Sequence, residues 1–587
     1  MHDQNTKLLK KIMVSYALTF MVISLTDSLT MISDGMTISR GLGATALAAI
    51  GLADPSYKIV SLFSGVLSVG LQSLCAQAMG SGDREKANRI FSAALFVTAA
   101  IAVLLTVSGF ACTDTLCRLF GTEKNSDVYR HLYDYLRGWF TGIPGYILFY
   151  VLSPLATLDG NKRILTVSTL IQSAINIAGD ILSVFVFGAG TYGVGLSTGI
   201  AYNISAVVLM LNFVRKQSAF RPFSAPPDFR SLPKALNIGL PYFTELCCRV
   251  LAPLLINRTI LAVGGSLAMS AVSVKSSMIG FCLIIGNGVA ASVGLMTQIL
   301  HSEKDAKSLQ STVKIGLRFL IKLDALFSAL LFLLAGVVAG LFMPAGTEEW
   351  TLAVRVVRCL AVSLLLHGCN RIIIQYLQGA RKMLPVHLMT TFHRIVALTV
   401  FTVILGYSFG TAGLFAAIPV SEGAVLLGYI AVVLLKNRDR DFWSSVLMLP
   451  DGFGYNDDNS RAFSIHSVEE AVSVSKQIEE FLEQHQVDKR TSFFSGLCME
   501  ELATNVILHG FTKNNSKYYC DIKVMIDPDG IVLRIRDNCP YFDIRERYNS
   551  LSEEDANASI GIRLIYAVAK DVKYINVLKT NTIIIRM

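Results

Sequence analysis

Runs of about twenty apolar residues recur along most of this chain and limit what it can fold into. A helix needs roughly 20 residues to cross about 30 Å of hydrocarbon, and inside a bilayer only helices or closed barrels satisfy their backbone hydrogen bonds. The runs extend from Met13 to about Leu435 and stop after Lys436. Only 16% of the residues are charged, against roughly 25% in an ordinary soluble protein. We therefore predict a polytopic helical membrane protein followed by a soluble tail.

Twelve membrane-spanning helices are predicted from these runs. They cover residues 13–33, 46–70, 90–112, 138–158, 164–187, 193–214, 237–262, 268–299, 315–343, 352–376, 384–408 and 412–435. Lys and Arg are concentrated in the N-terminal segment and in alternate loops, which therefore face the cytoplasm. An even number of spans places both termini in the cytoplasm, so we expect a multi-pass protein of the cell (inner) membrane. No small-residue cleavage site follows the N-terminal segment, which makes the first span an anchor rather than a signal peptide.

The two halves of the apolar region resemble each other. The segment "GATALAAIG" at Gly43 is echoed by "GSLAMSAVS" at Gly265, and "LDGNKRIL" at Leu158 by "LQGARKML" at Leu377. A repeat of six spans keeps its orientation, so it predicts two lobes with a transport site between them; a receptor or a lipid scaffold is the alternative. The predicted division is an N-lobe (1–215), a linker (216–236), a C-lobe (237–437), a second linker (438–460) and a soluble domain (461–587).

The cysteine and charge patterns exclude several classes of protein. The eleven cysteines form no CxxC pair and have no histidines at zinc spacing, so neither a zinc site nor a disulfide framework is expected. The net charge of +9 comes mostly from basic residues at the ends of spans, where they orient helices and touch lipid headgroups. No recognition motif points to nucleic acid. The expected partners are the lipid bilayer and a small-molecule substrate.

Two carboxylates and an amide in the first and fifth spans are the main candidates for a site inside the membrane. A charge at the bilayer centre costs about 2.5 to 3.5 kcal/mol, so Asp34 and Asp180 need a reason to be there. Asn176 precedes Asp180 by four residues and shares its helix face. If the spans meet, these oxygens suit a coupling ion, H⁺ or Na⁺. In the alternative, Asp34 is solvated at the outer interface and Asp180 only bonds to Asn176.

Weaker candidates of both charges lie mostly in the C-lobe. The possible acids of this second lobe are Glu245 and Asp324, with Glu422 a further one. The basic residues in or near spans are Lys58, Lys275, Arg371 and Arg394. These cations either pair with the acids or extend to an interface, and we expect the second behaviour for the two arginines. If several of the lysines line the transport site between the lobes, we expect an anionic substrate.

The order of these motifs resembles the MATE (multidrug and toxic compound extrusion) family of efflux transporters. Asp34, then "GLGATALAAIGLADP", then "QSLCAQAMGSGDREKANR" carry the resemblance, which covers about residues 10–437. It implies that Asp34 and the pair Asn176 and Asp180 form the N-lobe cation site. It also implies Na⁺- or H⁺-coupled export of cationic or amphipathic compounds by rocking of two lobes. The first span lacks the proline that some branches use for bending, and Glu245 is out of register with a seventh-span glutamate of the family.

The tail has the pattern of a small α/β sandwich. A polar, turn-rich linker at 450–460 precedes it. The predicted strands are 461–466, 518–526, 530–537, 572–578 and 582–587, and the predicted helices are 468–484, 490–510 and 561–570. The sequence "DPDG" is a hairpin turn between the second and third strands. A layer of helices on a largely antiparallel sheet follows.

The second tail helix carries groups suited to a metal-bound nucleotide. Glu501 and Asn505 lie four residues apart on one face, and His509 follows one turn later. An amide oxygen can ligate Mg²⁺ that bridges phosphates, and a glutamate can act as a base. Asp537 ends a predicted strand, where it can accept a hydrogen bond from an adenine amino group. A solvated helix face is the alternative explanation.

Three segments in order, "EELATNVILHG", "IRDN" and "SIGIRLI", resemble the N, G1 and G2 boxes of the GHKL ATP-binding superfamily, most closely its anti-sigma-factor serine kinase branch. The resemblance covers about 463–587. It implies bound ATP and Mg²⁺, with Asn505 on the metal, Glu501 as catalytic base and Asp537 on the adenine. A lid over about 538–560 is implied too.

Two of these boxes depart from the usual glycines. Cys539 and Pro540 stand in G1, and in G2 Gly561 is kept while Arg563 replaces a second glycine, so the grip on the phosphates is altered. The motif GxxxxGK[ST] is absent from the sequence, which excludes a conventional ABC motor.

The predicted protein is therefore a cation-coupled antiporter that exports drugs or other amphipathic organic compounds. Its cytoplasmic tail binds ATP and either regulates transport or phosphorylates a client protein, as a serine kinase does. Two alternatives remain open: a lipid-linked or polysaccharide flippase of the same superfamily, and a membrane-tethered signalling kinase with a receptor-like transmembrane part.

Overall fold

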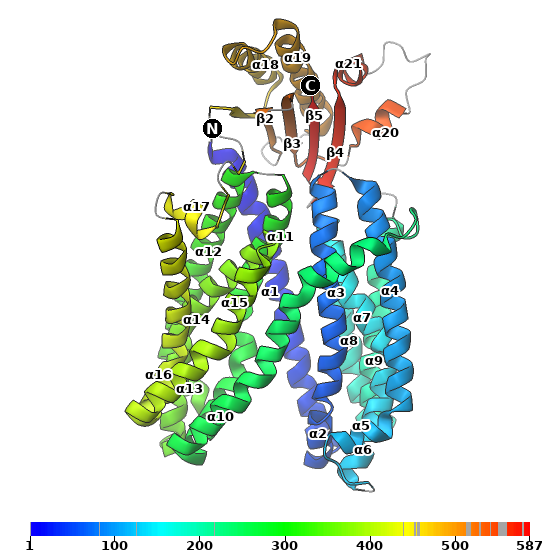
Figure 1. Cartoon of the computed structure of the whole chain (residues 1–587). Helices are drawn as coiled ribbons and strands as arrows, with labels where there is room; N and C mark the ends of the chain where they lie inside the picture. The colour runs from blue at the N-terminus through cyan, green and yellow to red at the C-terminus, as the bar shows by residue number, and fades with distance from the viewer. Residues whose placement is uncertain are drawn as a thin grey trace.

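A long helical bundle carries a small α/β domain at one end (Figure 1). The computed structural model describes residues 2–587 apart from 82, 125, 216–217, 304, 438–439, 451–452, 455–457, 512–517, 528–529, 541, 550–559 and 578–579. The N-terminal end of the bundle and the C-terminal end of the sheet lie at the same end of the molecule.

The bundle divides into two groups of helices. The first contains α1 (His2–Gly41), α2 (Ala44–Gly51), α3 (Asp54–Gly80), α4 (Arg84–Ala111), α5 (Thr113–Leu119), α6 (Asp127–Phe140), α7 (Ile143–Leu158), α8 (Lys162–Ile181), the π-helix η1 (Leu182–Val186) and α9 (Gly190–Val214). After the short η2 (Phe229–Ser231), the second contains α10 (Leu232–Cys282), α11 (Ile284–Ser302), α12 (Ala306–Leu333), α13 (Ala335–Gly340), α14 (Glu348–Gly379), α15 (Met383–Thr391), the π-helix η3 (Phe392–Val396), α16 (Ala397–Lys436) and α17 (Phe442–Val446). We call these groups the N-lobe and the C-lobe.

Nine helical segments of the described chain are long and apolar enough to cross a membrane, or ten if α6 and α7, which meet at a 53° bend, form one span. Two of the segments, 229–282 and 383–436, have 54 residues each, about 80 Å at 1.5 Å per residue. Each is interrupted by a glycine with left-handed backbone, Gly265 (φ 61°) and Gly410 (φ 62°). These glycines lie between predicted spans, while the total of twelve remains a prediction.

The lobes meet along α3 and α10, where small residues let the backbones touch. A Cβ added at Gly239 would lie 2.0 Å from the carbonyl oxygen of Val66. One turn later the hydroxyl groups of Tyr242 and Ser61 are 2.7 Å apart. Figure 1 shows α3 and α10 diverging beyond this contact, away from the α/β domain.

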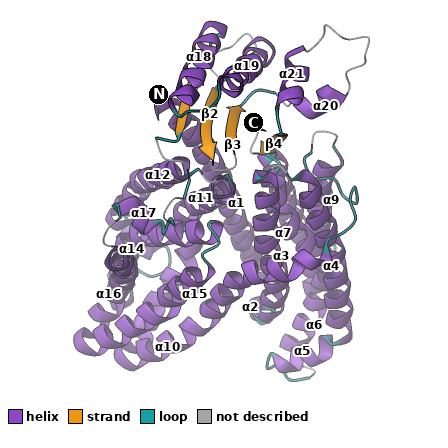
Figure 2. Ribbon diagram, turned by 45° about the horizontal axis from the view of Figure 1, so that its top comes forward, coloured by secondary structure: helices purple, strands orange, loops and turns teal. Residues whose placement is uncertain are grey.

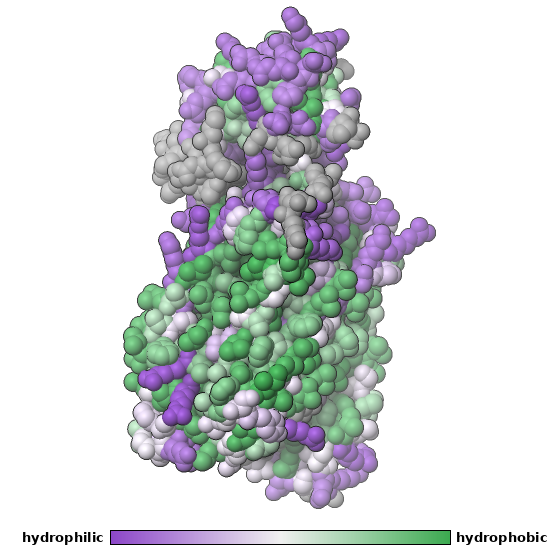
Figure 3. Space-filling model, turned by 60° about the vertical axis from the view of Figure 1, so that its left-hand side comes forward, coloured by the Kyte–Doolittle hydropathy of each residue, from purple (hydrophilic) through white to green (hydrophobic). Residues whose placement is uncertain are grey.

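The bundle presents a broad apolar surface and the α/β domain a polar one (Figure 3). Large exposed side chains of the bundle include Leu104, Val107, Val207, Leu211, Leu326 and Leu427, each more than half exposed. Apolar patches of this extent are unusual on soluble proteins, and they suit contact with lipid tails.

The tail is a five-stranded antiparallel sheet of order β1-β2-β3-β5-β4. Its elements are β1 (Ser460–Ile465), α18 (Val468–Gln484), α19 (Lys489–Asn505), the π-helix η4 (Val506–Gly510), β2 (Cys520–Asp527), β3 (Gly530–Asp537), α20 (Ile544–Asn549), α21 (Ile560–Val568), β4 (Asp571–Val577) and β5 (Thr580–Arg586). In Figure 2, α18 and α19 lie on the side of the sheet away from the bundle. The predicted antiparallel sheet with a helical layer is confirmed. The two central residues of the hairpin turn (528–529) and about half of the expected lid (541 and 550–559) fall outside the described residues.

Candidate functional site

The structure brings the predicted N-lobe residues together. The first span was predicted to end at residue 33, directly before Asp34, but α1 continues to Gly41 and Asp34 lies inside this helix. Asp180 and Asn176 are buried on one face of α8. The carboxyl groups of Asp34 and Asp180 are close enough to interact directly.

The pair leaves oxygen atoms available to a cation. Asp180 Oδ1 accepts a hydrogen bond from the Ser197 hydroxyl, and Asn176 Nδ2 donates to Thr198 Oγ1 at 3.0 Å. Asp34 Oδ1 and Asp180 Oδ2 are buried and have no hydrogen-bond partner among the described residues. Two facing carboxylates in a buried site require a shared proton or a counter-ion.

Helix geometry changes beside this pair, because η1 begins two residues after Asp180. Such π-helical turns occur frequently at functional sites. The sequence analysis missed Asp27, which lies two turns before Asp34 on the same face of α1 and is exposed. The sequence feature that could have identified Asp27 is its position as an acidic residue inside the first predicted span.

The C-lobe acids differ in their surroundings. Glu245 Oε1 accepts hydrogen bonds from Arg371 at 3.3 Å and from Arg394 at 3.1 Å. The expectation that these arginines extend to an interface was therefore wrong, since both are held by a carboxylate of α10. Asp324 is buried on α12, and its Oδ1 has no hydrogen-bond partner in the described part of the chain. Lys58 pairs with Asp54 near the start of α3.

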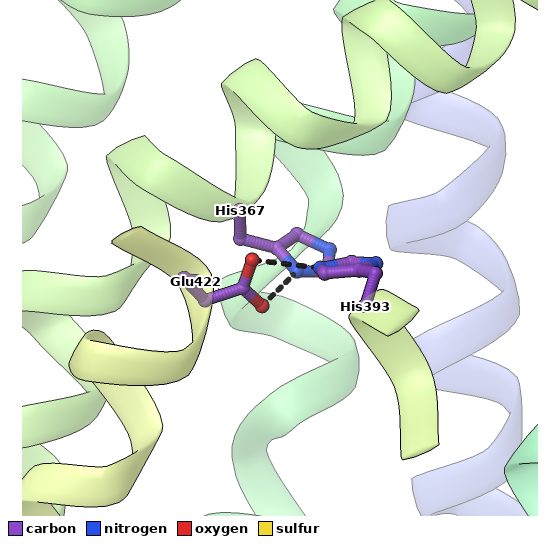
Figure 4. Close-up of side chains that lie close together, drawn as sticks. All are labelled: His367, His393 and Glu422. Atoms are coloured by element: carbon purple, nitrogen blue, oxygen red, sulfur yellow. Dashed lines mark hydrogen bonds and ion pairs between the residues drawn. The ribbon is translucent and has the colours of Figure 1, made fainter. Parts of the chain in front are cut away.

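Glu422 is surrounded by two histidines that the sequence analysis missed. Figure 4 shows His367 and His393 pointing at its carboxylate, with 2.9 Å from His367 Nδ1 to Oε1 and 2.7 Å from His393 Nε2 to Oε2. Asn370 Nδ2 donates to Oε2 at 2.8 Å. The ligand atoms of the two histidines and Glu422 lie within 4.8 Å of one another, a set that can also hold a metal ion.

In the tail, Asn505 and Asp537 line one pocket of about 360 Å³. Its walls are mostly apolar and include Leu502, Val506, Phe542, Ile544, Ile562 and Ile583. Asp537 Oδ1 accepts hydrogen bonds from Asn581 Nδ2 and from the backbone N–H of Cys539, both at 2.8 Å. Burial raises the pKa of the Asp537 carboxyl group. An apolar pocket lined by a carboxylate that two hydrogen bonds hold in place suits a planar heterocycle with an amino group.

The other predicted tail residues lie beside this pocket. The described residues that line the pocket do not include Glu501, Gly561 or Arg563. Glu501 packs against Gly561, where an added Cβ would lie 2.1 Å from its Oε2 atom. Cys539 and Pro540, the departures from the glycine pattern, do line the pocket, and Cys539 packs against Gly510. Arg563 lies on α21.

One face of the tail sheet rests on the C-lobe. Leu533 and Ile535 of β3 point into the tail core, so the alternate residues Arg534 and Arg536 face the bundle. Arg534 lies 3.0 Å from Asp305 and 3.4 Å from Glu303, and Arg536 also pairs with Glu303. Although burial opposes ionisation of Asp305, the cations Arg534, Lys523 and Arg536 hold its pKa below the usual range.

The same domain also contacts the N-lobe. Arg84, at the start of α4, lies 3.3 Å from Asp543, and its guanidinium group is 5.3 Å from the ring centre of Tyr574. Asp543 is followed directly by Ile544, which lines the pocket that contains Asn505 and Asp537. The tail therefore connects both lobes at one end of the bundle.

Helices long and apolar enough to cross a bilayer define a multi-span membrane protein, and its tail is a small α/β domain with a pocket lined by Asn505 and Asp537. The MatE family model matches residues 19–182 and 241–408, and the model of the histidine kinase-like ATPase domain matches 466–587. The chain belongs to the MatE family and carries a C-terminal ATPase-like domain.

Relatives and solved structures agree with this assignment. Multidrug export protein MepA of Staphylococcus haemolyticus is 22% identical over 432 residues, which cover 73% of this chain and 94% of that protein. MepA of a Staphylococcus aureus strain is 22% identical over 405 residues, which cover 67% of this chain and 86% of that protein. An outward-facing multidrug resistance MATE transporter of the MOP superfamily has a TM-score of 0.68 at 20% identity. The match covers 75% of this chain and 96% of that chain. A MOP superfamily transporter from Pyrococcus furiosus has a TM-score of 0.65 at 20% identity, and the match covers 74% of this chain and 98% of that chain. That transporter is described as having a binding pocket of reverse polarity.

Proposed function

We propose that this protein exports drugs or other amphipathic organic compounds in exchange for H⁺ or Na⁺. The observation that carries the proposal is the pair Asp34 and Asp180, whose carboxyl groups face each other with unpartnered oxygens inside the N-lobe. The multidrug export relatives support the substrate class.

In this proposal, cation binding neutralises the Asp34 and Asp180 pair and favours one arrangement of the lobes. Coupling requires that the cation binds the two arrangements with different affinity. Asn176 belongs to the same polar group, because its partner Thr198 and the Asp180 partner Ser197 both donate to the Val194 carbonyl. The two termini lie at one end of the bundle, which together with the basic loops supports a cytoplasmic location for both.

The direct test is dye transport by the purified full chain in proteoliposomes. We expect rhodamine 6G, a cationic amphipathic dye, to move against its gradient when a proton or sodium gradient is imposed. Comparing the two gradients identifies the ion. Transport that responds to neither gradient would contradict ion coupling.

For the tail, we propose binding of ATP with Mg²⁺. Asn505 is placed to hold the metal and Asp537 to bind the adenine amino group, since both line one pocket. Glu501 lies one turn before Asn505 as a candidate base, and Gly561 and Arg563 belong to the proposed phosphate side. Bound ATP supplies a transferable phosphoryl group, and the proposed acceptor is a cytoplasmic client protein.

We further propose that the tail regulates transport by bridging the lobes. Arg534 and Arg536 hold the C-lobe, while Asp543 holds Arg84 of the N-lobe. Asp543 lies between the pocket residues Phe542 and Ile544. A change in the pocket therefore acts on the segment that holds the N-lobe.

Replacing both Arg534 and Arg536 with alanine should undock the tail from the C-lobe. Removing one partner of a buried ion pair costs about 3 to 5 kcal/mol. The variant removes both arginines from Glu303 and leaves Asp305 with Lys523, at 3.7 Å, but without Arg534. We expect faster hydrogen–deuterium exchange in β2, in β3 and at the start of α12, with no change in α18. Arg490→Ala, on the exposed surface of α19, is the control. Unchanged exchange in the double variant would contradict docking through these pairs.

A further inference from the structure

Two arginines share one carboxylate inside the C-lobe, with a third arginine and a second carboxylate near them. Arg371 and Arg394 share one oxygen of Glu245, at 3.3 and 3.1 Å. Arg249 is close enough to Glu245 and Arg394 to act on their charges, and Glu422 also acts on Arg394. Arg371 and Arg394 thus place two positive charges on the single carboxylate of Glu245, so this arginine cluster carries a net positive charge.

The cluster has more hydrogen-bond donors than the surrounding protein accepts. Each guanidinium group has five N–H donors in a planar fork. The Nε atoms of Arg371 and Arg394 are buried and have no hydrogen-bond partner within the described chain. Glu422 is already bound by two histidines and Asn370. Unpaired buried donors are unfavourable, and a further anion would supply the missing acceptors.

The arginine cluster lies beside the boundary between the lobes. Tyr242 of α10 contacts Ser61 of the N-lobe, and Glu245 follows three residues later. Arg249, one turn further, is exposed. The side chains of Glu245 and Arg394 are 20% and 22% exposed. A compound between the diverging lobes can therefore reach the cluster.

We propose that the arginine cluster binds the acidic group, a carboxylate or phosphate, of an amphipathic organic anion that the protein transports. This inference rests on the proposed export function and names its substrate class. Planar guanidinium groups bind such acidic groups through paired, charge-assisted hydrogen bonds. A divalent metal ion on Glu422 and its two histidines would add charge to an already positive cluster, so the charge balance favours an anion. The coupling cation and the anion then use separate lobes.

The test compares two dyes with one ring system but opposite charge. Binding of fluorescein, an anion, and rhodamine 6G, a cation, is measured by fluorescence anisotropy with the full chain in phosphatidylcholine vesicles. Arg371→Gln and Arg394→Gln should each weaken fluorescein binding by about tenfold, the loss expected for a hydrogen bond to a charged group, and leave rhodamine binding unchanged. Glu245→Gln should strengthen fluorescein binding, because it removes the carboxylate that competes for the arginines.

Two further variants separate binding from folding. Arg355→Gln changes an exposed arginine of the same helix α14 and should have no effect. Arg394→Lys keeps the charge and should retain part of the binding. Fluorescein binding that survives both glutamine substitutions would overturn the inference, as would equal weakening by Glu245→Gln, which is the behaviour of a purely structural ion pair.

The source of the anion and the export function are tested separately. If phosphatidylglycerol in the vesicles competes with fluorescein, and Arg394→Gln removes the competition, a lipid phosphate occupies the cluster; no competition means that the cluster selects soluble anions. Gradient-driven rhodamine export without any fluorescein binding would overturn only the anion site. Failure of gradient-driven export for both dyes would instead overturn the proposed function.

Discussion

Asp180→Asn is expected to abolish ion-coupled export and leave the folded bundle intact. The amide occupies nearly the same volume and can still accept the hydrogen bond from Ser197. It can neither take up a proton nor offer a negative charge to Na⁺. We expect gradient-driven rhodamine 6G transport in proteoliposomes to fall by about 100-fold, equivalent to about 2.7 kcal/mol.

The matched control for this variant is Asp54→Asn. Asp54 also lies in the N-lobe, but it is exposed at the start of α3 and pairs with Lys58. Its neutralisation should leave transport within about twofold, since exposed ion pairs contribute little. Undiminished coupled transport by Asp180→Asn would remove this residue from the mechanism.

Asn505→Ala is expected to remove binding of ATP with Mg²⁺ to the full chain. Asn505 lines the tail pocket at the end of α19, where the helix changes to the π-helical η4. Loss of a metal ligand should weaken binding by about 100-fold or more, or at least 2.7 kcal/mol, measured by titration calorimetry. Gln477→Ala, on the neighbouring α18, should bind like the unmodified protein.

A second variant distinguishes binding from chemistry in the tail. Glu501→Gln should retain ATP binding, because Glu501 is absent from the described pocket lining, but should stop any phosphoryl transfer. If Asn505→Ala binds ATP normally, the tail pocket does not use the metal ligand that its sequence indicates. Docking to the lobes would then be the main role of the tail.

Local pattern was enough to predict most strands and helices of the tail, although α20 was not expected as a helix. Apolar residues alternate in 530–537, and the observed β3 has the same bounds. The helix at 468–484 also agrees with α18, since its start is fixed by Ser467, whose hydroxyl accepts from the Glu470 N–H. Such features depend on neighbours in the sequence, which is why sequence alone identifies them.

Pairings between distant segments could not be predicted in the same way. Glu245 is 126 residues from Arg371 and 149 from Arg394, and the choice between pairing and extending to an interface depends on which helix faces pack together. The Arg534 and Asp305 pair spans 229 residues. Asp34 and Asp180 were candidates because charged groups inside spans are costly, but that their spans meet was implied only by the resemblance to a known family.

The tail and both lobes belong to one polypeptide, and this has a consequence for how the protein responds in a cell. Undocking of the Arg534 and Arg84 contacts is a unimolecular step, because the released tail stays tethered at a high effective concentration. The fraction of docked molecules then does not depend on copy number or on competition for a separate regulatory subunit. The activity of each transporter molecule would then depend on whether its own tail holds a nucleotide.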